Sequence, residues 1–139
     1  MNTTTIQKKV INQAIYYGHH MVVKNFYFFD GWECDVLSVD RFDYTTEYEV
    51  KRSRPDFLAD FNKKEKHYST SNGYGCNYFY FACPNNLIKP YEIPEYAGLI
   101  YASSKGSRII KRAPQLHKES LTYSQLRKIA LKIMNSKYV

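Results

Sequence analysis

A chain of 139 residues has the length of one domain and can bury a core of its own. Its 44% hydrophobic content excludes a disordered chain, and its three cysteines, an odd number, argue against a disulfide framework and for a reducing compartment. The formal net charge of +7 favours a polyanionic partner. No signal pattern is present, and no apolar run approaches the roughly 18 residues of a membrane span. We therefore expect a cytoplasmic protein (host cytoplasm if viral) with no membrane partner.

The predicted elements begin with a helix over Thr5 to Tyr17, because Thr3 to Thr5 can cap it and apolar residues follow at helical spacing. Strands are expected over the next three β-prone segments: Met21 to Phe29, Trp32 to Val39 and Tyr44 to Lys51. Pro55 then suits the first turn of a second helix. The segment Ser69 to Gly75 is rich in Ser, Asn and Gly, and it is predicted to form an exposed loop.

The second half of the chain supplies further strands and a closing helix. Asn77 to Ala82 is almost continuously apolar and aromatic, which indicates a buried central strand. Two more strands and a last helix are expected further on, over Ala97 to Ala102, Ser107 to Lys111, and Ser120 or Thr122 to about Asn135. No internal repeat or long linker interrupts this order, so the periodicity predicts a single mixed α/β domain over residues 1–139.

Acidic side chains alternate with apolar ones in two of the predicted strands. Residues two apart on a strand point to the same face, so Glu33 and Asp35 lie together. For the same reason Glu47, Glu49 and Lys51 lie together on the next strand. If the intervening residues reverse the chain, both sets converge on one patch, where the carboxylates repel each other unless a cation neutralises them. A hard divalent ion such as Mg2+ suits these oxygen ligands, and an adjacent lysine can polarise a phosphate or help to activate water.

Asp35, then thirteen residues, then Glu49-x-Lys51 resembles the catalytic core of the PD-(D/E)XK nuclease superfamily. The similarity continues from Val50 to Phe61 and from Lys63 to His67. These segments are similar to the compact branch that contains the MmcB-like, DNA-repair-associated proteins and their phage relatives. In that branch a Lys-x-Ser-x-x-Asp-Phe-x-x-Asp run, which corresponds here to Lys51 through Asp60, follows the acidic strand and opens a helix. The resemblance covers the chain from about residue 32 to its end.

The resemblance implies a restriction-endonuclease-like αβββαβ core with a central mixed sheet flanked by helices. It also implies a Mg2+-dependent deoxyribonuclease, with Mn2+ able to substitute, that hydrolyses phosphodiester bonds in DNA repair, recombination or phage replication. The implied catalytic residues are Asp35, Glu49 and Lys51. The implied metal ligands are Asp35, Glu49, Glu33 and the backbone carbonyl of Val50, a ligand type that a hard ion accepts. The expected nucleic-acid contacts are Arg52, Arg54, Lys63, Lys64, Lys66 and His67.

Several of these residues also have ordinary structural interpretations. The superfamily's first helix often supplies another acid, whereas the predicted first helix contains none, so either Glu33 fills that role or the site works with fewer ligands. Asp56 suits the positive end of a helix, and Asp60 could hold a basic residue such as Arg52 or Arg54. The lysines after the acidic strand could form a solvated face, and the neighbouring histidine is as readily structural as substrate-binding.

A rival hypothesis is a nucleic-acid-binding module that has the nuclease fold but little activity of its own, recruited into a repair or phage complex. The small size leaves no recognition domain, so strict sequence specificity would need a homodimer or a repair or replication partner. A second basic region could bind the nucleic-acid backbone: Lys105, Arg108, Lys111, Arg112, Lys118, Arg127, Lys128 and Lys132.

Overall fold

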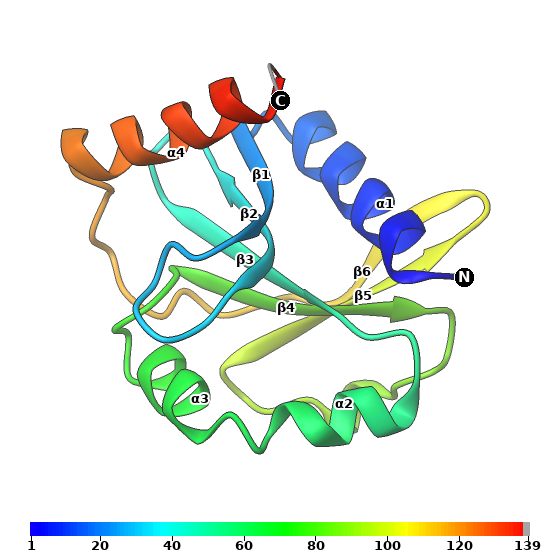
Figure 1. Ribbon diagram of the computed structural model, residues 1–139. Coiled ribbons are helices and arrows are strands. Elements are labelled where there is room, and N and C mark those ends of the chain that lie inside the picture. Colours follow the sequence, from blue (N-terminus) through cyan, green and yellow to red (C-terminus); the bar gives the residue numbers. More distant parts are fainter. Residues whose placement is uncertain (138–139) are drawn as a thin grey trace.

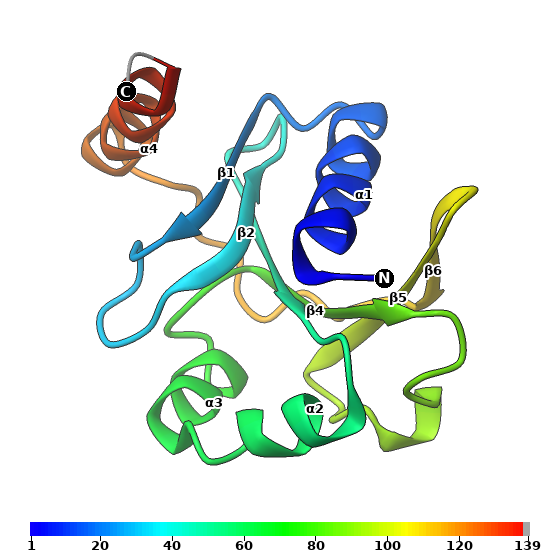
Figure 2. The ribbon, with the colours of Figure 1, turned by 45° about the vertical axis from the view of Figure 1, so that its right-hand side comes forward.

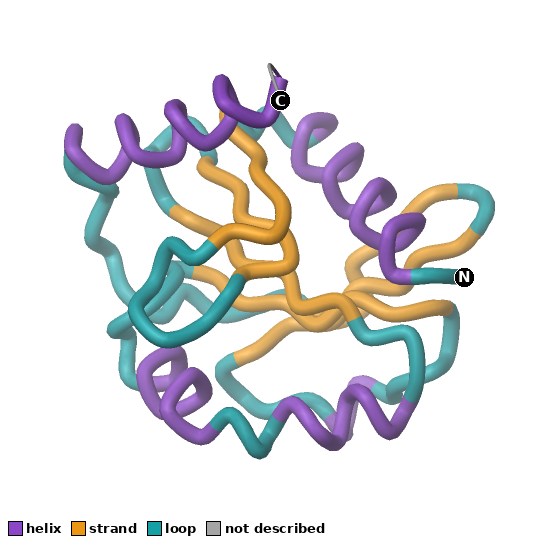
Figure 3. Tube along the Cα trace, viewed as in Figure 1, coloured by secondary structure: helices purple, strands orange, loops and turns teal. Residues whose placement is uncertain are grey.

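A six-stranded sheet forms the centre of the molecule, and helices cover both of its faces (Figures 1 and 3). The structure is a computed structural model that describes residues 1–137. The strands are β1 (Met21–Phe26), β2 (Cys34–Val39), β3 (Thr45–Val50), β4 (Tyr78–Pro84), β5 (Ala97–Ser103) and β6 (Gly106–Lys111). The helices are α1 (Thr3–Tyr16), α2 (Arg54–Asp60), α3 (Lys64–Ser71) and α4 (Tyr123–Lys137), with one 3-10 turn, η1 (Pro90–Glu92).

The strands lie side by side in the order of the sequence, from β1 to β6. The first three form an antiparallel meander, and β5 and β6 form an antiparallel hairpin. Between them, β4 pairs in parallel with both β3 and β5. The connection from β3 to β4 carries α2 and α3, and the connection from β4 to β5 carries η1. This mixed sheet flanked by helices confirms the predicted α/β fold class.

Side-chain caps set the first residues of the N-terminal helices. The Asn2 side chain accepts a hydrogen bond from the Thr5 N–H at 2.8 Å, so α1 begins two residues earlier than predicted. The Ser53 hydroxyl accepts from the Asp56 N–H at 3.3 Å, with Pro55 in the first turn of α2 as the sequence predicted. This second cap fixes where the chain turns away from the end of β3.

The region after α2 differs from the prediction. The chain bends after Asp60, and a separate helix, α3, extends to Ser71. The prediction of an exposed loop over Ser69 to Gly75 was therefore wrong in its first part, where Thr70 is fully buried. Small polar residues favour a loop by local propensity, but packing of one face of α3 against the sheet overrides that preference.

Two sets of helices cover the two faces. On one face, α1 packs against all the central strands; on the other, α2 and α3 lie under β3 to β5, and α4 packs on β1 (Figures 1 and 2). Figure 2 shows α1 and α4 on opposite sides of the β1–β2 pair. The face under α2 and α3 is mainly aromatic and aliphatic, with Phe57, Phe79, Phe81 and Leu99 buried together. None of the helices within residues 1–137 is both long and apolar enough to cross a membrane.

Candidate active site

Antiparallel pairing brings the start of β2, with Asp35, next to the end of β3, with Glu49. Val36 pairs with Tyr48, so Asp35 reaches the end of β3. There its Oδ2 atom accepts a hydrogen bond from the Val50 N–H at 2.8 Å. The chain reversal that the sequence predicts between these strands is present, and it brings the two acids close together.

A pocket of about 330 Å³ opens at this end of β3. Four residues that the sequence analysis expected to be catalytic or metal-binding line it: Asp35, Glu49, Val50 and Lys51. The other lining residues come from the start of α1 and from α2 and the bend after it: Thr3, Asp56, Ala59, Asp60 and Lys63. We call this cavity the acidic pocket. Most of the expected centre is therefore gathered around one accessible cavity.

Three lysines converge on two buried acids beside the acidic pocket. Glu49 is 3% exposed and Asp60 is 1% exposed. Lys51 Nζ donates hydrogen bonds to Glu49 Oε1 at 3.1 Å and to Asp60 Oδ1 at 2.9 Å. Lys66 Nζ lies 2.9 Å from Glu49 Oε2 and 3.4 Å from Asp60 Oδ2. Lys63 reaches in from the solvent-exposed rim, with its Nζ 3.4 Å from Asp60 Oδ1.

An imidazole bridge holds Asp60 in place. His67 Nε2 lies 2.7 Å from Asp60 Oδ2, and the Tyr96 hydroxyl lies 2.5 Å from His67 Nδ1. The His67 ring also stacks on Phe81 of β4, with an interplanar angle of 21°. Because the histidine is fixed on three sides, it keeps one Asp60 oxygen occupied and leaves the other directed at Lys51.

The acids differ in how readily they hold a proton. Burial raises the pKa of Asp35, although a backbone hydrogen bond and the nearby lysines lower it. Burial also raises the pKa of Glu49, where the charge of Lys66 opposes the rise and the charge of Asp35 adds to it. Burial acts in the same sense on Asp60, but the His67 hydrogen bond and the lysine charges prevail and hold its pKa well below the ordinary value. Asp60 is therefore the permanently ionised anchor of the network.

The acidic pocket is lined by groups with oxygen donors. Glu49 Oε2 is buried and forms an ion pair with Lys66 Nζ at 2.9 Å. Asp35 and Glu49 line the pocket together with Val50, and carboxylate and backbone carbonyl oxygens are the ligand types that Mg2+ prefers. The donor set is small: in the described part of the chain, no group of three or more His, Cys, Asp or Glu side chains could hold a metal ion.

The other two acids of the hairpin lie outside the acidic pocket. Glu33 is exposed in the segment before β2 and does not line the pocket, so the geometry gives no support to its expected role as a metal ligand. Glu47 is fully buried, with both carboxylate oxygens 3.2 Å from the indole nitrogen of Trp32. Burial raises the pKa of Glu47 to about 8. It is a core acid, with its carboxylate bound to Trp32.

The expected nucleic-acid contacts divide into buried and exposed residues. Lys66 and His67 are only 2% and 9% exposed, so the geometry gives no support to their expected role as nucleic-acid contacts. Their charges and hydrogen bonds are directed at the buried carboxylates instead. Arg54 is exposed, but its guanidinium donates hydrogen bonds of 2.6 and 3.0 Å to the Glu92 carboxylate. The remaining three expected contacts are exposed: Arg52, Lys63 and Lys64.

Sequence reasoning missed Asp60 as the shared partner of Lys51 and Lys66, because it paired Asp60 with a neighbouring arginine instead. The available signal was in α3, where Lys66, His67 and Thr70 form one buried face. Hydrophobic periodicity does not detect a buried face made of polar side chains.

Comparison with known proteins shows the fold and nothing finer. No family model and no curated protein matches the chain. Among solved structures, it is similar to the SPO1766 protein of unknown function from Silicibacter pomeroyi, with a TM-score of 0.72 and 22% sequence identity. The match covers 99% of this chain and 87% of that one. The shared architecture therefore extends over the whole α/β domain.

Proposed function

We propose that this chain is a metal-dependent deoxyribonuclease that hydrolyses phosphodiester bonds of DNA at the acidic pocket. The observation that carries the proposal is that Asp35, Glu49 and Lys51 line one pocket open to solvent, where Lys51 Nζ donates to Glu49 Oε1 at 3.1 Å. The net charge of +7 supports a polyanionic substrate around this small acidic centre. DNA repair, recombination or phage replication would be the natural setting.

In this proposal Asp35 and Glu49 would hold Mg2+ or Mn2+. A bound ion of this kind polarises a phosphoryl oxygen and lowers the pKa of bound water. Lys51 is fixed by two carboxylates, so its ammonium would neutralise charge that develops on the scissile phosphate without first having to be ordered. Lys63, with 55% of its side chain exposed at the rim, would hold the phosphate backbone that enters the pocket.

The proposal predicts DNA cleavage that requires Mg2+ or Mn2+ and is abolished by EDTA. Glu49→Gln removes one negative ligand while keeping the shape of the side chain, so we expect cleavage to fall about a hundredfold or more. The measurement is cleavage of labelled single-stranded, duplex and branched DNA, together with Mn2+ binding followed by electron paramagnetic resonance.

Glu95→Gln makes the same chemical change at an exposed position outside the acidic pocket, and it should cut like the wild type. Thermal unfolding of both variants separates loss of function from loss of fold. Cleavage that persists in Glu49→Gln, or wild-type protein that binds Mn2+ no better than the variant, would refute the proposal.

A binding module with little activity is the second candidate, and two observations favour it. Glu49 and Asp60 already have three lysines around them, which reduces their need for a metal ion. In addition, α1 presents an amide to the site, since Gln7 Nε2 donates to the Asp35 backbone oxygen at 3.1 Å. DNA binding without cleavage in any metal, unchanged by Glu49→Gln, would support this alternative.

A further inference from the structure

A second and larger cavity lies at the other end of β3. It has a volume of about 570 Å³, which is within the range of small-molecule sites. Its wall comes from the end of α1, the β2–β3 turn, the central strands and the segment after β6. The residues that the argument uses are Tyr17, Phe42, Tyr44, Tyr48, Tyr78 and Tyr80. We call this cavity the aromatic pocket.

The floor of the aromatic pocket is rigid. Tyr48 and Tyr80 are 3% and 9% exposed, and their rings stack with centroids 6.0 Å apart and an interplanar angle of 17°. Gly98 makes room for this arrangement, because a Cβ there would collide with the Tyr80 ring and would lie 2.6 Å from the Ala113 backbone nitrogen. The rim is open, since Phe42 is 59% exposed. A planar ligand would therefore find preformed aromatic faces.

Polar groups on the floor can pair with the edge of such a ligand. His19 Nδ1 lies 2.7 Å from the Ser38 hydroxyl, which lies 3.3 Å from the Tyr48 hydroxyl. Burial lowers the pKa of His19, so the ring is neutral and keeps both a donor and an acceptor nitrogen. Asp40 Oδ1 accepts hydrogen bonds from the backbone N–H of Phe42, at 2.8 Å, and of Tyr44. Asp40 therefore orders the turn that carries the aromatic rim.

Two cations complete the aromatic pocket. Arg112 and Lys118 line it and are exposed, and within residues 1–137 neither forms an ion pair. Among the described residues that line the pocket, Asp40 is the only acid, and it is hydrogen-bonded to the turn. The rim thus offers two free positive charges beside an aromatic wall, a combination that suits a ligand with a planar ring and an anionic group.

We propose that the aromatic pocket is a nucleotide-binding site, in which the base stacks on the tyrosine wall and Phe42 while Arg112 and Lys118 bind the phosphate. The site is separate from the acidic pocket, because Thr3 at one end of α1 lines the acidic pocket and Gln13 lines this one. Ten helical residues correspond to about 15 Å. The proposal is independent of nuclease activity, and its ligand is either a free nucleotide or one nucleotide of a single strand.

The test is calorimetric titration in EDTA with thymidine and adenosine 5′-monophosphates, a short single-stranded oligonucleotide, ribose 5-phosphate and inorganic phosphate. We expect the nucleotides to bind more tightly than either base-free phosphate. Phe42→Ala should weaken nucleotide binding about fivefold or more, and Phe42→Tyr should retain it, since stacking needs only an aromatic face. Arg112→Ala should weaken binding about tenfold. If the oligonucleotide binds more tightly than the mononucleotides, and if Phe42→Ala and Arg112→Ala weaken its binding to the same extent, the natural ligand is single-stranded nucleic acid.

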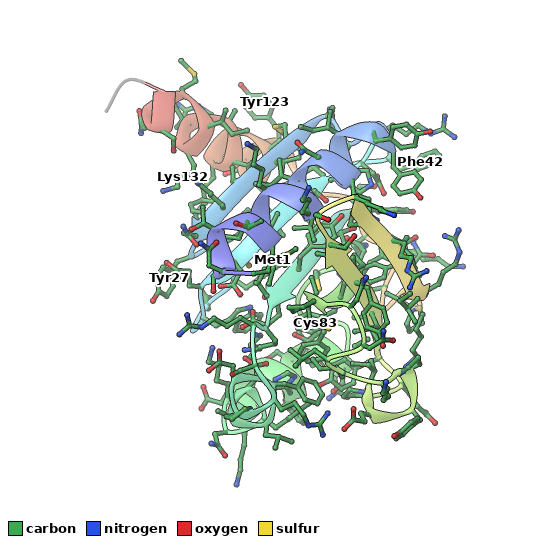
Figure 4. All side chains as sticks on the ribbon, turned by 90° about the vertical axis from the view of Figure 1, so that its right-hand side faces the viewer. Met1, Tyr27, Phe42, Cys83, Tyr123 and Lys132 are labelled. Atoms are coloured by element: carbon green, nitrogen blue, oxygen red, sulfur yellow. The ribbon has the colours of Figure 1, made fainter. Side chains whose placement is uncertain are left out.

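Matched controls lie on other parts of the surface, outside the aromatic pocket. Lys89→Ala removes an exposed positive charge and Tyr123→Ala removes an exposed ring; Figure 4 shows Phe42 near the end of α1 and Tyr123 on α4. Neither control should change affinity. The proposal is overturned if no nucleotide binds at millimolar concentration, if ribose 5-phosphate binds as tightly as the nucleotides, or if Lys89→Ala and Tyr123→Ala weaken binding as much as Phe42→Ala and Arg112→Ala. The four substituted side chains are exposed, so folding should be unaffected, and thermal unfolding checks this.

Discussion

Lys66→Met is expected to lower the free energy of unfolding by about 3–5 kcal/mol at pH 8, the cost of removing one partner from a buried ion-pair network. Lys66 is 2% exposed and lies within 3.5 Å of both Glu49 and Asp60. The acids raise its pKa despite burial, so in the wild type this stabilisation is complete below the ordinary lysine pKa and is lost only as pH rises beyond it. Methionine fills a similar volume but leaves Glu49 buried without a neutralising charge beside Oε2.

The loss should be smaller at pH 5 than at pH 8, because Glu47, whose pKa is raised by burial to about 8, is then protonated and no longer adds a negative charge near Lys66; the raised pKa of Glu49 acts in the same direction. Urea unfolding at both pH values measures this. Lys64→Met is the matched control, since Lys64 is exposed on the same helix, and it should change stability by less than about 0.5 kcal/mol. Equal losses in the two variants would show that the buried network does not carry the effect.

Glu47→Gln is expected to stabilise the protein at alkaline pH and to remove part of its pH dependence. Burial raises the pKa of Glu47 from 4.5 to about 8, so the folded state binds this proton more tightly than the unfolded state does. The contribution of this group to the free energy of unfolding is therefore fully present below pH 4.5 and is lost as pH rises through 8. At about 1.36 kcal/mol per pH unit the full loss is roughly 5 kcal/mol. Glutamine is neutral throughout and can still accept from Trp32.

The measurement is urea unfolding of wild type and Glu47→Gln between pH 5 and 9. The difference in stability should grow with pH in favour of the variant. The low pKa of Asp60 has the opposite pH dependence below pH 4, but it is common to both proteins and cancels in the comparison. Glu95→Gln, an exposed control, should follow the wild type. A constant difference across this range would mean that Glu47 is ionised in the fold at every pH tested.

The hairpin was predictable because strand alternation is a local property. Two acids and a lysine at spacings of two must share a face, and a reversal between the strands must bring the sets together. Glu33 shows the limit of this rule, because β2 begins one residue after it and the register between β2 and β3 does not reach it. Pairing in register placed Asp35, and not Glu33, at the end of β3.

The lysine network was not predictable for a different reason. Lys66 and Lys64 are both helical lysines, and the sequence does not distinguish the buried one from the exposed one. Their difference depends on the bend after α2, which turns one face of α3 toward the sheet. The aromatic pocket was not predictable either, because its tyrosines come from several elements. The chain has 14 tyrosines, and no local sequence pattern distinguishes those that line the pocket from the others.

The position of α2 and α3 between two parallel strands has a consequence for how the molecule folds. Parallel neighbours cannot be joined by a tight turn, so β4 must pair with β3 after a long loop closes, which is slower than forming the local meander of β1 to β3. The meander carries Asp35 and Glu49, but Asp60 and Lys66 arrive only with that closure. In a folding intermediate with only the first three strands formed, Asp35 and Glu49 would therefore be exposed to water. Only the completed fold would bury Glu49 and place Lys66 beside it.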